Sequence, residues 1–213
     1  MPFTREQFFE LFGAYNAAIW PAEVVAYLLG IAAVLALVRP GRAAGQLISA
    51  ILAILWLWTG LFYHMVYFAR INPAAYAFGA LFVAQAVLFI LAGVSGSRLA
   101  FRFAPKPAKL LGAALIAYAM VIYELLGLAA GHGLMRGPLF GVAPCPTVIF
   151  TLGVLVLAEP PVPWWLLPIP LAWAVIGTSA ALTFGVAEDL GLAVAAVLVL
   201  VSLQLAGRQN RPG

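Results

Sequence analysis

Glu124 occupies the most informative position for chemistry in this sequence, because it interrupts a long apolar stretch at residues 109–130. Residues three and four positions apart share a helical face, and the neighbours of Glu124 on its face are small or flexible. They are Ala113, Ala117, Met120, Gly127 and Gly131. Small residues mark the places where helices approach each other in a membrane. The pattern predicts a carboxyl inside a helix bundle that carries a proton, binds a cation or anchors a substrate. The alternative is a protonated or paired structural carboxyl.

Two histidines, His64 and His132, lie near the ends of apolar stretches. The helical face of His64 is again small and polar, and an imidazole is a natural proton shuttle near neutral pH. Tyr63 and Tyr67 beside it indicate instead an aromatic belt at the membrane surface, where a histidine needs no task, and we favour this interpretation. His132 follows Glu124 by eight positions, between two glycines, and could fold back toward that carboxyl.

Further polar residues are predicted to gather at the same end of the bundle as Glu124. They are Glu23, Arg70, Asn72, Arg136 and the pair Glu188 and Asp189. A water-filled vestibule leading down to Glu124 would explain this convergence. Ordinary solvation of loops explains the exposed members equally well.

The donor atoms of a metal site are present in this sequence, but no typical spacing connects them. His64, His132, Glu124 and Cys145 offer ligands of the kinds that zinc accepts. The chain contains no H-x-x-x-H, H-E-x-x-H or C-x-x-C motif, so the signal is weak. The two histidines could also be axial ligands of a haem. Cys145 lies in Pro-Cys-Pro-Thr at a predicted helix start, where a thiolate is favoured, although such a cysteine is more often a packing residue. No cofactor is assigned.

The composition indicates a protein surrounded by lipid. Of 213 residues, 65% are apolar and 8% are charged, whereas about a quarter of the residues in ordinary globular domains are charged. Backbone polar groups inside a bilayer must be hydrogen-bonded within the protein, so spanning segments are helices or closed barrels. The apolar runs here are long and continuous rather than alternating, which favours helices. We therefore predict an all-α integral membrane bundle that forms a single domain over residues 1–213.

Seven transmembrane helices are predicted. They cover residues 21–38, 44–68, 73–94, 109–130, 146–158, 164–184 and 190–206. A crossing needs roughly 20 residues, so the fifth segment is the weakest because its apolar run is short. Thr4 and Gln7 have the spacing of a capping box, and the apolar residues that follow recur at helical intervals opposite charged ones. Residues 4–16 are therefore predicted to form a short amphipathic helix in the membrane interface.

The basic residues predict the orientation, because Lys and Arg favour the cytoplasmic side of a membrane. With the N-terminus outside and the C-terminus in the cytoplasm, eight of the 11 lie in cytoplasmic loops. The other three, Arg5, Arg70 and Arg136, lie outside. This distribution accounts for the net charge of +4, so no nucleic-acid partner is expected. Cys145 is the only cysteine, which excludes an intrachain disulfide.

Three segments taken together resemble a known family. They are residues 12–22 (FGAYNAAIWPA), 63–85 (YHMVYFARINPAAYAFGALFVAQ) and 141–157 (GVAPCPTVIFTLGVLVL). These segments are similar to a family of small, seven-helix bacterial membrane proteins catalogued as a domain of unknown function. The resemblance covers most of the chain. It implies a location in the bacterial inner membrane and carries over no activity.

These features favour a transporter or channel for a small solute or ion over an enzyme, with an outward-facing polar site around Glu124. One alternative is a membrane-embedded enzyme or redox subunit that binds a metal or haem through His64 and His132. Another is an accessory subunit of a larger membrane complex. The expected partners are the lipid bilayer and a small solute or ion, and a homo-oligomer is compatible with the apolar helix faces. The sequence leaves the substrate, the direction of transport and the coupling ion open.

Overall fold

The computed structural model describes residues 3–103, 107–131, 133–159 and 162–209, and these residues form a bundle of helices. Over these ranges the backbone forms no strand and only an isolated β-bridge, between Phe101 and Ala158. The all-α prediction is therefore confirmed. The α-helices are α1 (Arg5–Ile19), α2 (Ala22–Val38), α3 (Arg42–Trp58), α4 (Ala75–Phe89), α5 (Pro107–Ala117), α6 (Tyr123–Ala129), α7 (Pro144–Val156), α8 (Pro168–Phe184) and α9 (Gly191–Gln209).

Short segments of tighter or wider helix extend or connect these elements. The π-helical segments are η1 (Thr59–Tyr67), η3 (Ile90–Ser95) and η4 (Tyr118–Ile122), and the 3-10 segments are η2 (Phe68–Arg70), η5 (Leu134–Arg136), η6 (Trp164–Leu166) and η7 (Ala187–Leu190). η1 and η2 continue α3, η3 continues α4, and η4 joins α5 to α6. η7 makes the turn between α8 and α9.

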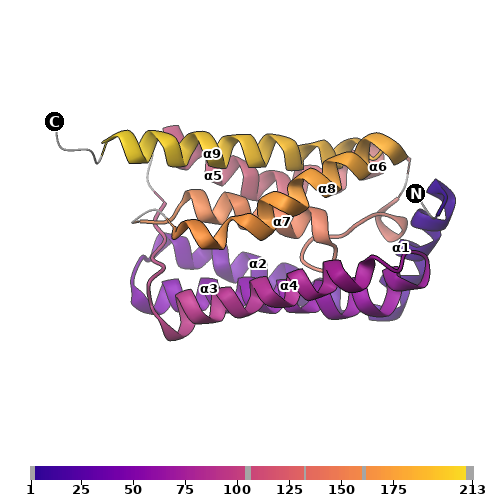
Figure 1. The fold of residues 1–213 in the computed structure, drawn as a ribbon, viewed down its shortest axis with the longest axis horizontal. Coiled ribbons are helices and arrows are strands. Elements are labelled where there is room, and N and C mark those ends of the chain that lie inside the picture. Colours follow the sequence, from indigo (N-terminus) through magenta and orange to yellow (C-terminus); the bar gives the residue numbers. More distant parts are fainter. Residues whose placement is uncertain (1–2, 104–106, 132, 160–161, 210–213) are drawn as a thin grey trace.

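The helices enclose α7 at the centre of the bundle (Figure 1). α3 packs against α2 and α4 on one side, while α5, α8 and α9 contact α7 on the other. Every residue of α7 from Pro144 to Leu155 is buried. With 13 residues, α7 is only about 20 Å long at 1.5 Å per residue. Because protein surrounds it, its length does not have to match the roughly 30 Å of hydrocarbon in a bilayer.

α5 and α7 contact each other at a pair of glycines. A Cβ atom on Gly112 would lie 2.8 Å from the carbonyl oxygen of Gly153, and a Cβ on Gly153 would lie 2.8 Å from the Gly112 oxygen. Both distances are shorter than van der Waals contact, so a side chain at either position would push the helices apart. This is the close packing of small residues on which membrane helices depend.

In the described part of the chain, four helices are long and apolar enough to cross a membrane. They are Arg42–Arg70, Ala75–Ser95, Lys109–Ala129 and Trp164–Phe184. α1 and α2 together would make a fifth, although they are bent by 83° at the break between them. These helices are those expected of a membrane protein. Helices also lie at the other predicted segments, as α2, α7 and α9, but a crossing by all seven stays a prediction.

α1 lies across one end of the bundle instead of along it (Figure 1). The predicted capping box is confirmed: Gln7 N–H donates to Thr4 Oγ1 at 3.2 Å, and Thr4 N–H donates to Gln7 Oε1 at 2.8 Å. The apolar face of α1, which includes Phe8, Phe12 and Tyr15, is buried against the bundle. The predicted amphipathic helix therefore exists, and it is protein that covers its apolar side.

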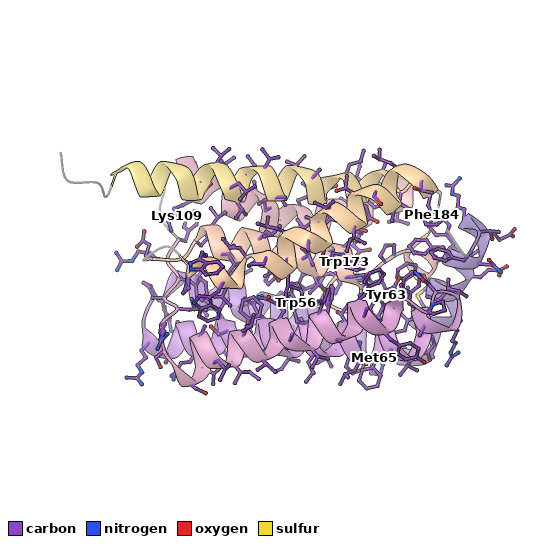
Figure 2. All side chains as sticks on the ribbon, in the orientation of Figure 1. Trp56, Tyr63, Met65, Lys109, Trp173 and Phe184 are labelled. Carbon is purple, nitrogen blue, oxygen red and sulfur yellow. The ribbon has the colours of Figure 1, made fainter. Side chains whose placement is uncertain are left out.

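The opposite end of the bundle holds a buried lysine, Lys109 (Figure 2). Its Nζ atom donates to the carbonyl oxygens of Val156 at 3.2 Å and Ala158 at 2.9 Å, where α7 ends. Glu159 Oε1 lies 3.6 Å from the same ammonium. Carbonyls at a helix C-terminus carry partial negative charge and stabilise a cation. Lys109 therefore closes this end of α7.

Candidate functional site

α1 covers a cavity of about 110 Å³ at its end of the bundle. The wall is built by α1, α4, α8, the segment from η1 to η2, and the start of α7. Most of the large side chains in it are aromatic: Phe3, Phe8, Phe12, Tyr63, Phe68, Phe78, Trp173 and Phe184. Asn72, Cys145, Ser179 and Asp189 supply polar groups. Figure 2 shows Tyr63, Trp173 and Phe184 at this end, far from Lys109.

Asp189 is the acid in this cavity, and η7 holds it there. The residue is only 2% exposed, the Tyr123 hydroxyl donates a hydrogen bond to its Oδ1 atom, and the Cys145 thiol lies against the same carboxyl. Burial raises the pKa of Asp189 to about 7, and Glu188 contributes to the rise, while Tyr123 and Cys145 oppose it. Asp189 therefore gains and loses a proton near neutral pH.

Glu188 is buried next to Asp189 and faces α6. A Cβ atom on Gly127 would lie 3.4 Å from Glu188 Oε1. The Tyr118 hydroxyl donates to the backbone carbonyl of Glu188 at 2.7 Å. Two tyrosines from η4 and α6, Tyr118 and Tyr123, thus fix the short helix η7.

The burial of this acidic pair differs from the exposure that loop solvation would give. Glu188 and Asp189 are predicted from the sequence to lie at the outer end, but not to form part of a site. η7 turns both side chains under neighbouring helices, so solvation of a loop does not explain why acidic residues occur here. One sequence feature could have indicated a buried site here. Two acids are adjacent in a turn of a few residues between apolar helices, with no basic residue nearby in the sequence.

Glu124 is half-buried and points toward protein, as its helical face predicted. Its Oε1 atom accepts a hydrogen bond from the Phe140 N–H at 2.9 Å, and the Tyr27 hydroxyl bonds to the same carboxyl. Glu124 does not line the cavity under α1. It fastens residues 137–143, which lead into α7, to α6 and α2.

His64 is fully buried among aromatic rings, not placed at the surface as the favoured interpretation predicted. Its ring lies 4.8 Å from that of Phe82 and 4.9 Å from that of Trp173, measured between centroids. Neither ring nitrogen has a hydrogen-bond partner among the described residues. The aromatic-belt interpretation is therefore wrong for His64, because η1 turns this side chain into the bundle behind the cavity wall.

The remaining outer candidates fall into two groups. Asn72 lines the cavity, and its Oδ1 atom accepts from the Ala74 N–H at 3.1 Å at the start of α4. Arg70 and Arg136 are exposed. Arg70 stacks over the Tyr67 ring at 4.5 Å, and Arg136 lines an open groove beside α1. Loop solvation explains the two arginines.

Glu23, in the first turn of α2, is buried with a 5% exposed fraction. Neither of its carboxylate oxygens accepts a hydrogen bond from any residue that the structure describes. It does not line the cavity under α1. Glu23 is therefore a buried acid separate from the pair Glu188 and Asp189.

The predicted metal ligands do not meet at one place in the described structure. His64 and Cys145 both border Trp173, whereas Glu124 is bonded to Tyr27 and Phe140. His132 lies outside the described residues. Within the described ranges, no group of three or more His, Cys, Asp or Glu side chains is arranged to hold a metal ion. The pairing of His64 with His132 around a haem stays a prediction.

Comparison with known proteins gives one match that covers nearly the whole chain. The profile of DUF6064, a family of unknown function, matches residues 5–212. No curated protein and no solved structure is significantly similar to the chain. The predicted resemblance to a family of unknown function is confirmed, while the match does not address the number of crossings. The chain belongs to the family of unknown function DUF6064.

Proposed function

We propose that this chain is a multi-pass protein of the bacterial inner membrane that transports a small solute or ion, with the cavity under α1 as its binding site. The observation that supports this most is the position of Asp189, a buried carboxyl that faces a cavity within the bundle. Large apolar side chains such as Leu28, Val175 and Leu182 are exposed on the helices, as lipid contact requires. Acids inside such bundles mark the paths of ions and substrates.

α1 is the element that controls access in this proposal. Phe3 and Phe8 form part of the roof and stack on Phe184 of α8, with ring centroids 5.1 Å and 5.3 Å apart. α1 meets α2 at an 83° bend. A swing of α1 about this bend would open the cavity, and its return would enclose the solute beside Asp189. Proton exchange at Asp189 near neutral pH would couple the two states.

The proposed topology keeps the N-terminus outside and all seven predicted crossings, with the C-terminus in the cytoplasm. The excess of Lys and Arg in the cytoplasmic loops supports this orientation. The cavity then lies in the outer half of the membrane and Lys109 lies near the cytoplasmic side. In this arrangement α7 crosses as a short helix that other helices shield from lipid.

Glu124 supports the site in this proposal instead of forming it. The predicted polar site around Glu124 is now centred on Asp189, because Asp189 lines the cavity and Glu124 does not. Glu124 positions Phe140 and with it the segment that begins α7. Its loss should therefore impair transport through the shape of the site.

Charge movement in reconstituted membranes tests the proposal. Liposomes containing the purified protein are placed on a solid-supported membrane and exposed to gradients of amines, amino acids, carboxylates and inorganic ions. We expect at least one class to produce a current or an internal pH change that Asp189→Asn reduces at least tenfold. Glu10→Gln, which removes an exposed carboxyl of α1, should leave the signal unchanged. A wild-type protein that gives no signal above protein-free liposomes for any class would contradict the proposal.

A further inference from the structure

The cavity under α1 has room for one small molecule. Its volume is about 110 Å³, which corresponds to the share of roughly three or four water molecules in the liquid. A dry cavity of roughly 150 Å³ in another protein accepts a benzene molecule. The ligand that fits here is therefore a compact one with only a few non-hydrogen atoms.

The charge of the lining favours a cation. Asp189 lies in the wall, and none of the described residues that line the cavity is a Lys, Arg or His. The carboxylate accepts one hydrogen bond from Tyr123 and faces the Cys145 thiol, whereas an ionised carboxylate has about four acceptor positions. A cation in the cavity would neutralise a charge that is otherwise buried. An anion would meet that charge unopposed.

The aromatic rings give the cavity a second means of attracting positive charge. The face of an aromatic ring is electronegative and binds alkylammonium groups, with tryptophan the strongest of the three rings. Trp173 is held by edge contacts with Phe78 and Phe82, at interplanar angles of 77° and 89°. Its orientation is therefore set by its neighbours before any ligand enters. Tyr63, Phe12 and Phe184 add further rings to the wall.

One polar group in the wall lacks a strong hydrogen-bond acceptor. The indole Nε1 of Trp173, a residue 7% exposed, is buried beside the Cys145 thiol and has no oxygen or nitrogen acceptor among the described residues. Sulfur is only a weak acceptor, so this N–H is incompletely satisfied, which costs free energy. A ligand that carries a hydroxyl or ether oxygen near its charged end would satisfy this donor.

Together these contacts define a substrate class, and we propose that the cavity binds a small alkylammonium ion that carries one hydrogen-bond acceptor. The ammonium head lies beside Asp189 and the aromatic faces, and the acceptor lies at Trp173. This inference rests on the proposed function in one respect, namely that the cavity is the solute site. A neutral apolar molecule of the same size would leave the charge of Asp189 unneutralised and the Trp173 N–H without a strong acceptor.

Equilibrium binding to the purified full-length protein in detergent tests the proposal without any transport step. The probes are ethanolamine, which is an ammonium ion at this pH, and its neutral isostere propan-1-ol, measured by calorimetry at pH 8. We expect ethanolamine to bind wild type at least tenfold more tightly than the isostere. Asp189→Asn should weaken ethanolamine binding at least tenfold. Trp173→Phe should weaken it roughly threefold to thirtyfold, while Trp164→Phe, at a 77% exposed tryptophan, should leave it unchanged.

Two results would overturn the proposal: equal affinity of wild type for ethanolamine and the isostere, or unchanged ethanolamine affinity in a folded Asp189→Asn variant. If a variant fails to fold, the comparison of the two probes on wild type still decides. Ethanolamine binding without flux of any solute would contradict the proposed transport and leave the site intact. Flux of another solute without ethanolamine binding would contradict the alkylammonium site and leave transport intact.

Discussion

The two ends of α7 each bring a buried charged residue close to a helix terminus, but the protein satisfies these residues differently. At the C-terminal end, the Lys109 ammonium is bonded to two carbonyls and lies near Glu159. At the N-terminal end, Asp189 lies against Cys145, receives one hydroxyl from Tyr123 and faces a cavity. The dipole of α7 favours a cation at its C-terminal end and an anion at its N-terminal end, and Lys109 and Asp189 match this preference.

We infer that this difference separates a structural end of α7 from the end that we propose binds the solute. The Lys109 ammonium has acceptors that come from the protein itself, so removing it should cost stability. Asp189 is incompletely satisfied in a low-dielectric setting, and this raises its pKa toward neutrality. Removing its charge should cost little stability and weaken ligand binding at least tenfold. Four experiments test this contrast between the two ends of α7.

Lys109→Met should have the largest effect on stability. The methionine keeps the apolar stem but removes the ammonium, leaving the carbonyls of Val156 and Ala158 without their donor. Because each buried carbonyl left without its donor costs about 1–3 kcal/mol, we expect a loss of roughly 2–6 kcal/mol in the free energy of unfolding, measured by denaturation in detergent. Arg98→Met, at an exposed cation near the same end, is the matched control and should change stability little. Equal losses in both variants would contradict the structural role of Lys109.

The pH dependence of stability should reveal Asp189. Its pKa in the folded protein, about 7, is above the ordinary value of 3.8. The folded state therefore binds the proton more tightly, so this contribution is fully present below about pH 4 and is lost as the pH rises through 7. Between pH 5 and pH 7 the wild type should lose roughly 2–3 kcal/mol of stability that Asp189→Asn does not lose. Parallel pH profiles of the two proteins would contradict the burial of an ionisable Asp189.

Tyr123→Phe should destabilise the protein in a pH-dependent way. The substitution removes the hydroxyl that donates to Asp189, and a hydrogen bond to a charged group contributes about 1.5–3 kcal/mol. The loss should therefore be larger at pH 8, where the carboxylate is ionised, than at pH 5. Tyr118→Phe is the matched control, because that hydroxyl donates to a neutral backbone carbonyl, and its effect should not vary with pH. The measurement is denaturation of both variants at each pH. A loss that varies with pH in Tyr118→Phe but not in Tyr123→Phe would contradict a hydrogen bond from Tyr123 to an ionised Asp189.

Thr4→Ala should have the smallest effect and should be confined to the roof of the cavity. The change removes the side-chain cap of α1 and typically costs about 1 kcal/mol. We expect faster amide exchange along α1 and unchanged exchange in α7. Thr183→Ala on α8, which removes an exposed hydroxyl that bonds only within its own helix, should leave α1 unchanged. Faster exchange throughout the bundle would show that α1 is not an independent lid.

Much of the fold could be predicted from local patterns. The capping box of Thr4 and Gln7 correctly marked the start of α1, and long apolar runs correctly marked the helices. The short run at residues 146–158 forms the helix α7, which protein surrounds, and its crossing of the membrane stays a prediction. The inward orientation of Glu124 followed from the small residues on its helical face. These are properties of one helix at a time.

The site was harder to predict. His64 was assigned to the membrane surface from Tyr63 and Tyr67, yet η1 turns it inward, where it packs behind Trp173. The sequence predicts that Asp189 lies in an exposed loop, because a turn between two apolar helices is normally exposed. Its burial depends on Tyr123, which is 66 residues away in sequence. A pattern of neighbouring residues cannot predict a contact between residues so far apart in the sequence.

The sequence alone determined that this chain is helical and suited to lipid, because apolar composition and helical spacing are set by neighbouring residues. The packing of the whole bundle selects the acid that faces the cavity, the cation that closes α7 and the aromatic rings that meet under α1. Burial and the pKa of Asp189 depend on the packing of η7 against α6, α7 and α8. Desolvation is a property of the assembled bundle, and no single segment carries it.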